Sequence, residues 1–135
     1  MTDNCGYIEH FKGEYVGNLK IDGVDISPIV AYFFTKNRVK WMWIKRKPIL
    51  EYDIDTGVFT KKNPTPKLEV YMKKQQQGNV AYKGEFVFFK FKYNIFAILN
   101  KNNGKEKFDL YVERQPQENQ NILNSINKAY NERTN

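Results

Sequence analysis

The feature that most constrains the fold is an alternation of apolar and polar residues with a period of two. Residues 68–73 and 107–113 alternate strictly, and residues 86–99 carry the same pattern over a length that suggests a bent or broken strand. Successive side chains of a β-strand point to opposite faces, so this pattern predicts strands that bury one face. The expected fold is therefore mainly β.

Short turn signals separate the alternating segments. Polar or glycine-containing turns are expected at residues 36–37, 55–57, 77–79 and 102–104. Gaps of this length join antiparallel neighbours, because a parallel pair needs a crossover of about a dozen residues or more. We expect an antiparallel sheet, which can be open or can form a small closed or bent barrel.

Two segments are interpreted separately. Residues 27–35 begin with Ser27-Pro28, as helices often do, yet β-branched and aromatic residues follow; a strand paired with residues 39–45 is favoured, and a helix stays open. After Pro116 the apolar residues recur at helical spacing, as Ile122, Leu123, Ile126, Ala129 and Tyr130. This spacing predicts one amphipathic C-terminal helix over residues 116–133, packed on the sheet.

Length and composition bound the organisation of the chain. Its 135 residues can bury one core, so residues 1–135 are expected to form a single domain with a frayed N-terminus at residues 1–6. The chain has a single cysteine, no apolar run long enough to span a bilayer and no leader pattern. We expect a cytoplasmic protein without a membrane partner, and its oligomeric state stays open.

Residues for catalysis or metal binding are scarce. The chain holds one histidine, His10, and one cysteine, Cys5, whereas a zinc site usually takes three or four such ligands. Asp55-Thr56-Gly57 resembles the catalytic loop of retroviral-type aspartic proteases over three residues, but its flanking residues differ from that family's pattern. A glycine-containing turn between residues 49–54 and 58–61 is expected instead. The prediction is no enzyme, no metal and no cofactor.

The net charge of +7 is concentrated in the middle of the chain. Residues 36–47 carry six cations and no acid, and both tryptophans of the protein stand among these cations. Aromatic rings can stack on bases and cations can contact phosphates, which is the combination that single-stranded nucleic acid requires. The candidate nucleic-acid-binding residues are Arg38, Lys40, Trp41, Trp43, Lys45, Arg46 and Lys47. Phe88, Lys90 and Lys92 are expected to make a second, similar face.

The sequence leaves the orientation of the tryptophans open. In a strand, Trp41 and Trp43 share one face with Val39 and Lys45, and this face can point to solvent or into the core. The favoured function is a non-enzymatic binding module for nucleic acid or another polyanion, with nucleic acid or an acidic protein as partner. One alternative is a small apolar-ligand-binding β-barrel of lipocalin-like build, by analogy of fold alone. Another is a protein-interaction or inhibitor module.

Overall fold

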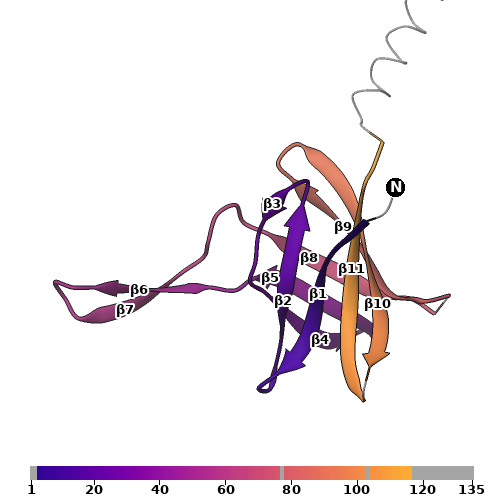
Figure 1. The fold of residues 1–135 in the computed structure, drawn as a ribbon, viewed down its shortest axis with the longest axis horizontal. Helices are drawn as coiled ribbons and strands as arrows, with labels where there is room; N and C mark the ends of the chain where they lie inside the picture. The colour runs from indigo at the N-terminus through magenta and orange to yellow at the C-terminus, as the bar shows by residue number, and fades with distance from the viewer. Residues whose placement is uncertain (1–2, 77, 103, 117–135) are drawn as a thin grey trace, which may run out of the picture.

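The computed structural model describes residues 3–76, 78–102 and 104–116, and their regular structure consists of antiparallel β-strands (Figure 1). The strands are β1 Asp3–Phe11, β2 Glu14–Ile21, β3 Val24–Asp25, β4 Ile29–Lys36, β5 Val39–Arg46, β6 Ile49–Asp53, β7 Val58–Lys62, β8 Glu69–Lys74, β9 Val80–Phe88, β10 Phe91–Asn102 and β11 Lys105–Arg114.

Eight of these strands close into a barrel. Their order is β1, β2, β4, β5, β8, β9, β10 and β11, and β11 pairs with β1 to complete the circle. Each strand is antiparallel to its neighbours, so the barrel runs up and down. The short β3 pairs with β2 beside β4, and the β6–β7 hairpin is inserted between the neighbours β5 and β8 (Figure 1). The expectation of a mainly antiparallel β fold that can close into a barrel is confirmed.

Two glycines allow the close approach of β1 and β2. A Cβ atom on Gly17 would lie 1.7 Å from the Tyr7 carbonyl oxygen, and one on Gly6 would lie 2.0 Å from the Asn18 carbonyl oxygen. Both distances are far below contact distance, and the obstructing atoms belong to the backbone. Glycine is therefore required at both positions of this pairing.

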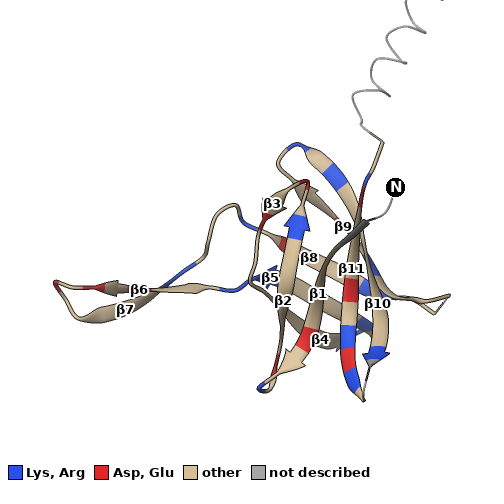
Figure 2. Ribbon diagram, viewed as in Figure 1, with Lys and Arg blue, Asp and Glu red and all other residues tan. Residues whose placement is uncertain are grey.

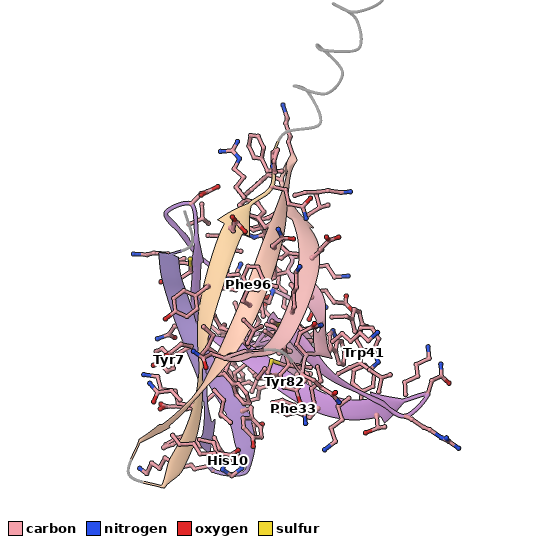
Figure 3. The ribbon with its side chains drawn as sticks, turned by 90° about the vertical axis from the view of Figure 1, so that its right-hand side faces the viewer. Tyr7, His10, Phe33, Trp41, Tyr82 and Phe96 are labelled. Carbon is pink, nitrogen blue, oxygen red and sulfur yellow. The ribbon has the colours of Figure 1, made fainter. Side chains whose placement is uncertain are left out.

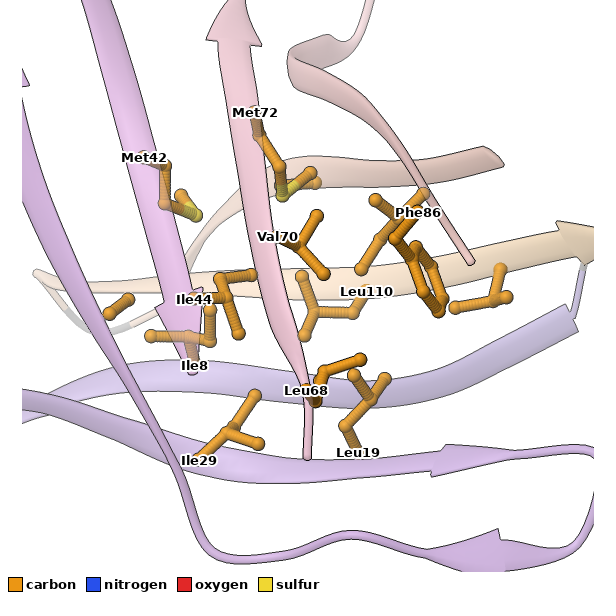
Figure 4. Close-up of a cluster of buried hydrophobic side chains, with 14 of the residues drawn as sticks. Ile8, Leu19, Ile29, Met42, Ile44, Leu68, Val70, Met72, Phe86 and Leu110 are labelled. Atoms are coloured by element: carbon orange, nitrogen blue, oxygen red, sulfur yellow. The ribbon is translucent and has the colours of Figure 1, made fainter. Parts of the chain in front are cut away.

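The barrel interior is filled by apolar side chains (Figure 4). Met42 and Ile44 of β5 are 0% exposed, and they pack in one cluster with inward side chains of the other seven barrel strands. An eight-stranded barrel has an interior just wide enough for side chains to fill. The described interior is accordingly a packed core.

Different contacts close the two ends of the barrel. At one end the ring of Phe33 lies 4.7 Å from that of Tyr15 and 5.8 Å from those of Tyr82 and Phe108; Figure 3 shows Phe33 and Tyr82 together. At the other end the hydroxyl of Tyr93 donates a hydrogen bond to the carboxylate of Asp22. Burial of Tyr93, together with this hydrogen bond, raises the pKa of Tyr93 to about 12.

The β6–β7 hairpin, residues 49–62, projects from the barrel and is called the arm below (Figure 1). Among the strands that the structure describes, β6 and β7 pair only with each other, and every residue of both is exposed. Residues 54–57 form the turn at its tip, so the expected glycine-containing turn is confirmed.

Three further expectations meet the structure. The strand favoured at residues 27–35 is confirmed, because β4 pairs with β5 along its whole length. Residues 86–99 are two strands, broken by a turn at Phe89 and Lys90, where Phe89 has a φ of 57°. Residues 3–6, expected to be part of a frayed N-terminus, belong to β1 from Asp3 onward, where β11 pairs with β1 from Asp3 and β2 pairs with it from Gly6. The helix expected over residues 116–133 lies outside the described residues except for Pro116.

Candidate nucleic-acid interface

The two tryptophans lie on the outer face of β5. Met42 and Ile44 point into the core, so the alternation turns Trp41 and Trp43 outward, and both are half-buried among neighbouring side chains. Figure 3 shows Trp41 at the outside of the barrel. The orientation that the sequence leaves open is therefore the solvent-facing one.

Aromatic side chains from three adjacent strands gather around these tryptophans. The Trp43 ring lies 5.3 Å from that of Tyr32 and 5.8 Å from that of Tyr71, to which it is nearly parallel at 2°. The Trp41 ring stacks on Phe34 at 6.5 Å and 9°. We call this set the aromatic patch: Tyr32, Phe34, Trp41, Trp43 and Tyr71.

Strand register explains why these rings meet. The β4–β5 connection is a two-residue turn in which Asn37 and Arg38 have φ values of 53° and 65°, as a hairpin turn of the primed type requires. This turn places Tyr32 opposite Trp43 and Phe34 opposite Trp41. On the other side of β5, strand β8 places Tyr71 opposite Trp43. Directly opposed side chains on one face of a sheet are close enough to interact.

The indole nitrogen of Trp43 is a buried donor. Its Nε1 atom has no hydrogen-bond partner among the described residues. Buried donors are nearly always paired in folded proteins, and an unpaired one is costly. The aromatic patch therefore contains a polar group that the described residues leave without a hydrogen-bond partner.

Cations border the aromatic patch. The Lys45 Nζ atom lies 5.0 Å from the Trp43 ring centre and 5.7 Å from that of Tyr32, within cation–π range. Lys73 stands opposite Trp41 on β8. At the barrel rim beyond Trp41 the surface is hollowed by about 380 Å³, and the described residues of its lining include Arg38, Lys40, Lys73 and Lys74 but no acid. This hollow is called the basic pocket.

One carboxylate lies at the opposite end of the aromatic patch. Glu69 accepts a hydrogen bond of 3.0 Å from the Tyr71 hydroxyl and lies 3.9 Å from the Lys67 Nζ atom. The hydrogen bond to Glu69 raises the pKa of the Tyr71 hydroxyl. The described lining of the basic pocket holds cations without an acid, whereas the opposite end of the aromatic patch combines lysines with the Glu69 carboxylate; Figure 2 marks the basic and acidic residues along the ribbon.

The structure divides the seven candidate residues. Trp41, Trp43 and Lys45 lie on the outer face, and Arg38 and Lys40 line the basic pocket. Arg46 instead donates to the carbonyl oxygens of Ile26 at 3.0 Å and Pro66 at 3.1 Å, and Lys47 lies 3.8 Å from Glu14. Arg46 thus ties the barrel to its connecting segments, and Lys47 faces away to β2.

Sequence reasoning missed three aromatic residues of the site. It also predicted a second basic-aromatic face that the structure does not form. Tyr32, Phe34 and Tyr71 enter through strand pairing, and only the β4–β5 turn signal pointed to the first two. The second face expected from Phe88, Lys90 and Lys92 is not formed, because Phe88 is 3% exposed and belongs to the core.

Catalytic and metal candidates are not assembled in the described part of the chain. Among residues 3–76, 78–102 and 104–116, no group of three or more His, Cys, Asp or Glu side chains could hold a metal ion. Cys5 is partly buried against the core, His10 is exposed beside the Tyr15 ring at 5.0 Å, and Asp55 lies at the tip of the arm.

No helix within the described residues has the length and apolar character to cross a membrane.

Comparisons with known proteins give no relative. No family model matches the chain, and searches of curated proteins and of solved structures find no significant similarity. A function for this chain has to be argued from its own surface.

Proposed function

We propose that this protein is a non-enzymatic module that binds single-stranded nucleic acid on the outer face of β4, β5 and β8. The observation that carries the proposal is the aromatic patch: five rings on the outside of the barrel, bordered by cations. Bases stack on exposed aromatic rings, and phosphates pair with lysine and arginine. The aromatic patch and the basic pocket supply these two kinds of contact side by side.

The dimensions suit a short stretch of strand. Lys45 and Val39 mark the two ends of the surface along β5, and six residue steps of strand span about 20 Å. Bases would stack on the rings between these ends, and the backbone would place a phosphate in the basic pocket. A surface of this length fits a site size at the low end of the roughly 4–16 nucleotides that one small β-barrel domain covers.

The contacts on the outer face predict what the protein distinguishes. Stacking needs unpaired bases, so a single strand should bind more tightly than a duplex of the same sequence. Ring faces and lysines read no hydrogen-bond pattern, so sequence preference should be weak. Binding should weaken with added salt, with a log-log slope of about −0.7 per phosphate contact, because each contact releases condensed counterions.

The basic pocket provides the first test. Lys73→Glu with Lys74→Glu should abolish binding to a fluorescent oligonucleotide while leaving the thermal unfolding of the barrel unchanged, since exposed charges contribute little to stability. The matched control is Lys101→Glu with Lys105→Glu, which changes the net charge equally in exposed residues beside the β10–β11 turn. Equal loss in both variants would show a response to net charge alone and would contradict the proposal.

The aromatic patch provides the second test. Trp41→Ala should weaken binding by about 1–3 kcal/mol, the contribution of one stacked base. Phe11→Ala removes an exposed ring, 56% accessible, from the end of β1 and should leave the affinity unchanged. Tryptophan fluorescence of the parent protein should be quenched on binding. If no RNA or DNA binds better than about 0.1 mM near physiological salt, the proposal is wrong.

A further inference from the structure

The basic pocket gathers positive charge that the described chain does not neutralise. Its lining includes the cations Arg38, Lys40, Lys73 and Lys74. Among the described residues, none of these four side chains forms an ion pair with a carboxylate, and the ion pairs of this part of the chain lie elsewhere. Like charges without a counter-charge repel one another, and a bound anion would relieve this repulsion.

Strand pairing places two of these lysines side by side. Strands β5 and β8 pair as far as Trp41 and Lys73, and Lys40 and Lys74 are the next residues on the two strands. Neighbouring like charges on adjacent strands are destabilising. Both lysines are exposed, so the packing of the core does not require them. The arrangement suits an anion that both ammonium groups contact at once.

The cations approach the basic pocket from both sides of the sheet. Met42 points into the core, so the alternation puts Lys40 on the inward side of β5, beyond the core. Met72 places Lys74 in the same way on β8. Lys73 lies on the outer side with the aromatic patch. The basic pocket thus wraps around the rim of the sheet, and the row of rings on the outer face ends there.

This geometry favours the end of a nucleic-acid strand over its interior. A phosphate inside a strand is a diester with a single negative charge. A terminal phosphate is a monoester, with a charge of about −1.5 to −2 at pH 7 and three strong acceptor oxygens. Cations on both sides of the rim can contact these oxygens from several directions, and no further strand has to leave the pocket.

We propose that the basic pocket binds the terminal phosphate of a single strand whose bases stack on the aromatic patch. The inference rests on the proposed function and adds that the protein recognises one phosphorylated end of its ligand. A 5′-phosphate and a 3′-phosphate carry the same monoester. The direction in which the strand runs along β5 decides which of them reaches the basic pocket.

Oligonucleotides of one sequence that differ only at their ends test this inference. One carries a 5′-phosphate, one a 3′-phosphate and one a hydroxyl at both ends. A phosphate at one of the two ends should raise the affinity at least about tenfold over the hydroxyl-ended strand, because the added charge and oxygen meet cations. The gain should shrink between about pH 8 and about pH 5, since the second pKa of the monoester is about 6.

A neutral double variant tests whether the basic pocket is responsible. Lys40→Gln with Lys74→Gln should reduce the gain from the terminal phosphate to less than about twofold. Lys101→Gln with Lys105→Gln removes the same charge beside the β10–β11 turn and should keep the gain of the parent. Thermal unfolding of both variants shows that the barrel is intact.

The outcomes separate this inference from the proposed function. If the hydroxyl-ended strand binds and neither terminal phosphate adds more than about twofold, the inference is overturned and the proposed function stands. Equal gains from both ends, or a full gain in the Lys40 and Lys74 variant, would also overturn it, since general charge attraction or another site would then be responsible. If no strand binds, with or without a terminal phosphate, both are wrong.

Discussion

The barrel and the arm are made from the same kind of alternating strand and use it in opposite ways. In β5 the inward residues Met42 and Ile44 are 0% exposed, whereas Leu50 and Phe59 of the arm are 62% and 63% exposed. Leu50 and Tyr52 of β6, like Met42 and Ile44 of β5, are apolar residues two positions apart on one strand face. Alternation therefore specifies which side chains share a face, but a face is buried only where strands distant in the sequence come to cover it.

The largest contrast should appear when one apolar side chain is truncated in each region. Ile44→Ala should lower the free energy of unfolding by about 2–5 kcal/mol, because a packed core does not close around the lost volume. Leu50→Ala on the arm should change it by less than about 0.5 kcal/mol. Urea unfolding followed by tryptophan fluorescence, at a protein concentration too low for association, measures both.

A smaller contrast is expected between two cations. Arg46 donates hydrogen bonds of 3.0 and 3.1 Å to the carbonyl oxygens of Ile26 and Pro66 in the segments that connect the barrel strands. Arg46→Ala should therefore lower the free energy of unfolding by about 1–3 kcal/mol. Lys62 forms an exposed ion pair with Glu51, so Lys62→Ala should cost about 0–1 kcal/mol. Equal costs in urea unfolding would mean that the connections do not depend on Arg46.

A further effect should be confined to alkaline pH and to the barrel. Folding raises the pKa of Tyr93 from 10.0 to about 12, so the folded state favours the protonated hydroxyl. Its contribution to stability is complete below pH 10 and is lost as the pH rises toward 12. The Tyr93→Phe variant should be less stable than the parent below pH 10, and the difference in free energy of unfolding should shrink as the pH rises from 10 toward 12. Urea midpoints of both proteins at several pH values measure this difference. A constant deficit would contradict the role given to the Tyr93–Asp22 hydrogen bond.

Much of the fold could be predicted from the sequence because local patterns encode it. Strand positions, side-chain faces and most turns follow from alternation and from glycine and asparagine. The length of residues 86–99 suggested a bent or broken strand, but the position of the break could not be predicted, since neither Phe89 nor Lys90 is a typical turn former and Phe89 adopts a positive φ. The projection of the arm from the barrel could not be predicted either, because Leu50, Tyr52 and Ile54 alternate with acids as the apolar residues of a half-buried strand do.

The candidate site was predicted in part for the same reason. The cluster at residues 36–47 is contiguous, so composition alone revealed it. Tyr71 and Lys73 join it through the pairing of β5 with β8, which the inserted arm separates in the sequence. Lys45 lies over the Trp43 ring, whereas Arg46 donates a hydrogen bond to the carbonyl oxygen of Ile26. This difference depends on which groups the fold brings near each side chain, and no sequence pattern shows it.

The pairing of β1 with β11 has a consequence for how the chain folds. Asp3 lies beside Val112, so the last seam of the barrel joins residues from nearly opposite ends of the chain. Contacts of such long sequence separation slow folding, because a large loop must be ordered before they form. We expect the hairpins from β4–β5 to β10–β11 to assemble first and the seam to close last. Until then β1 and β11 each present an unpaired edge, which is the form of this protein most prone to aggregate during synthesis.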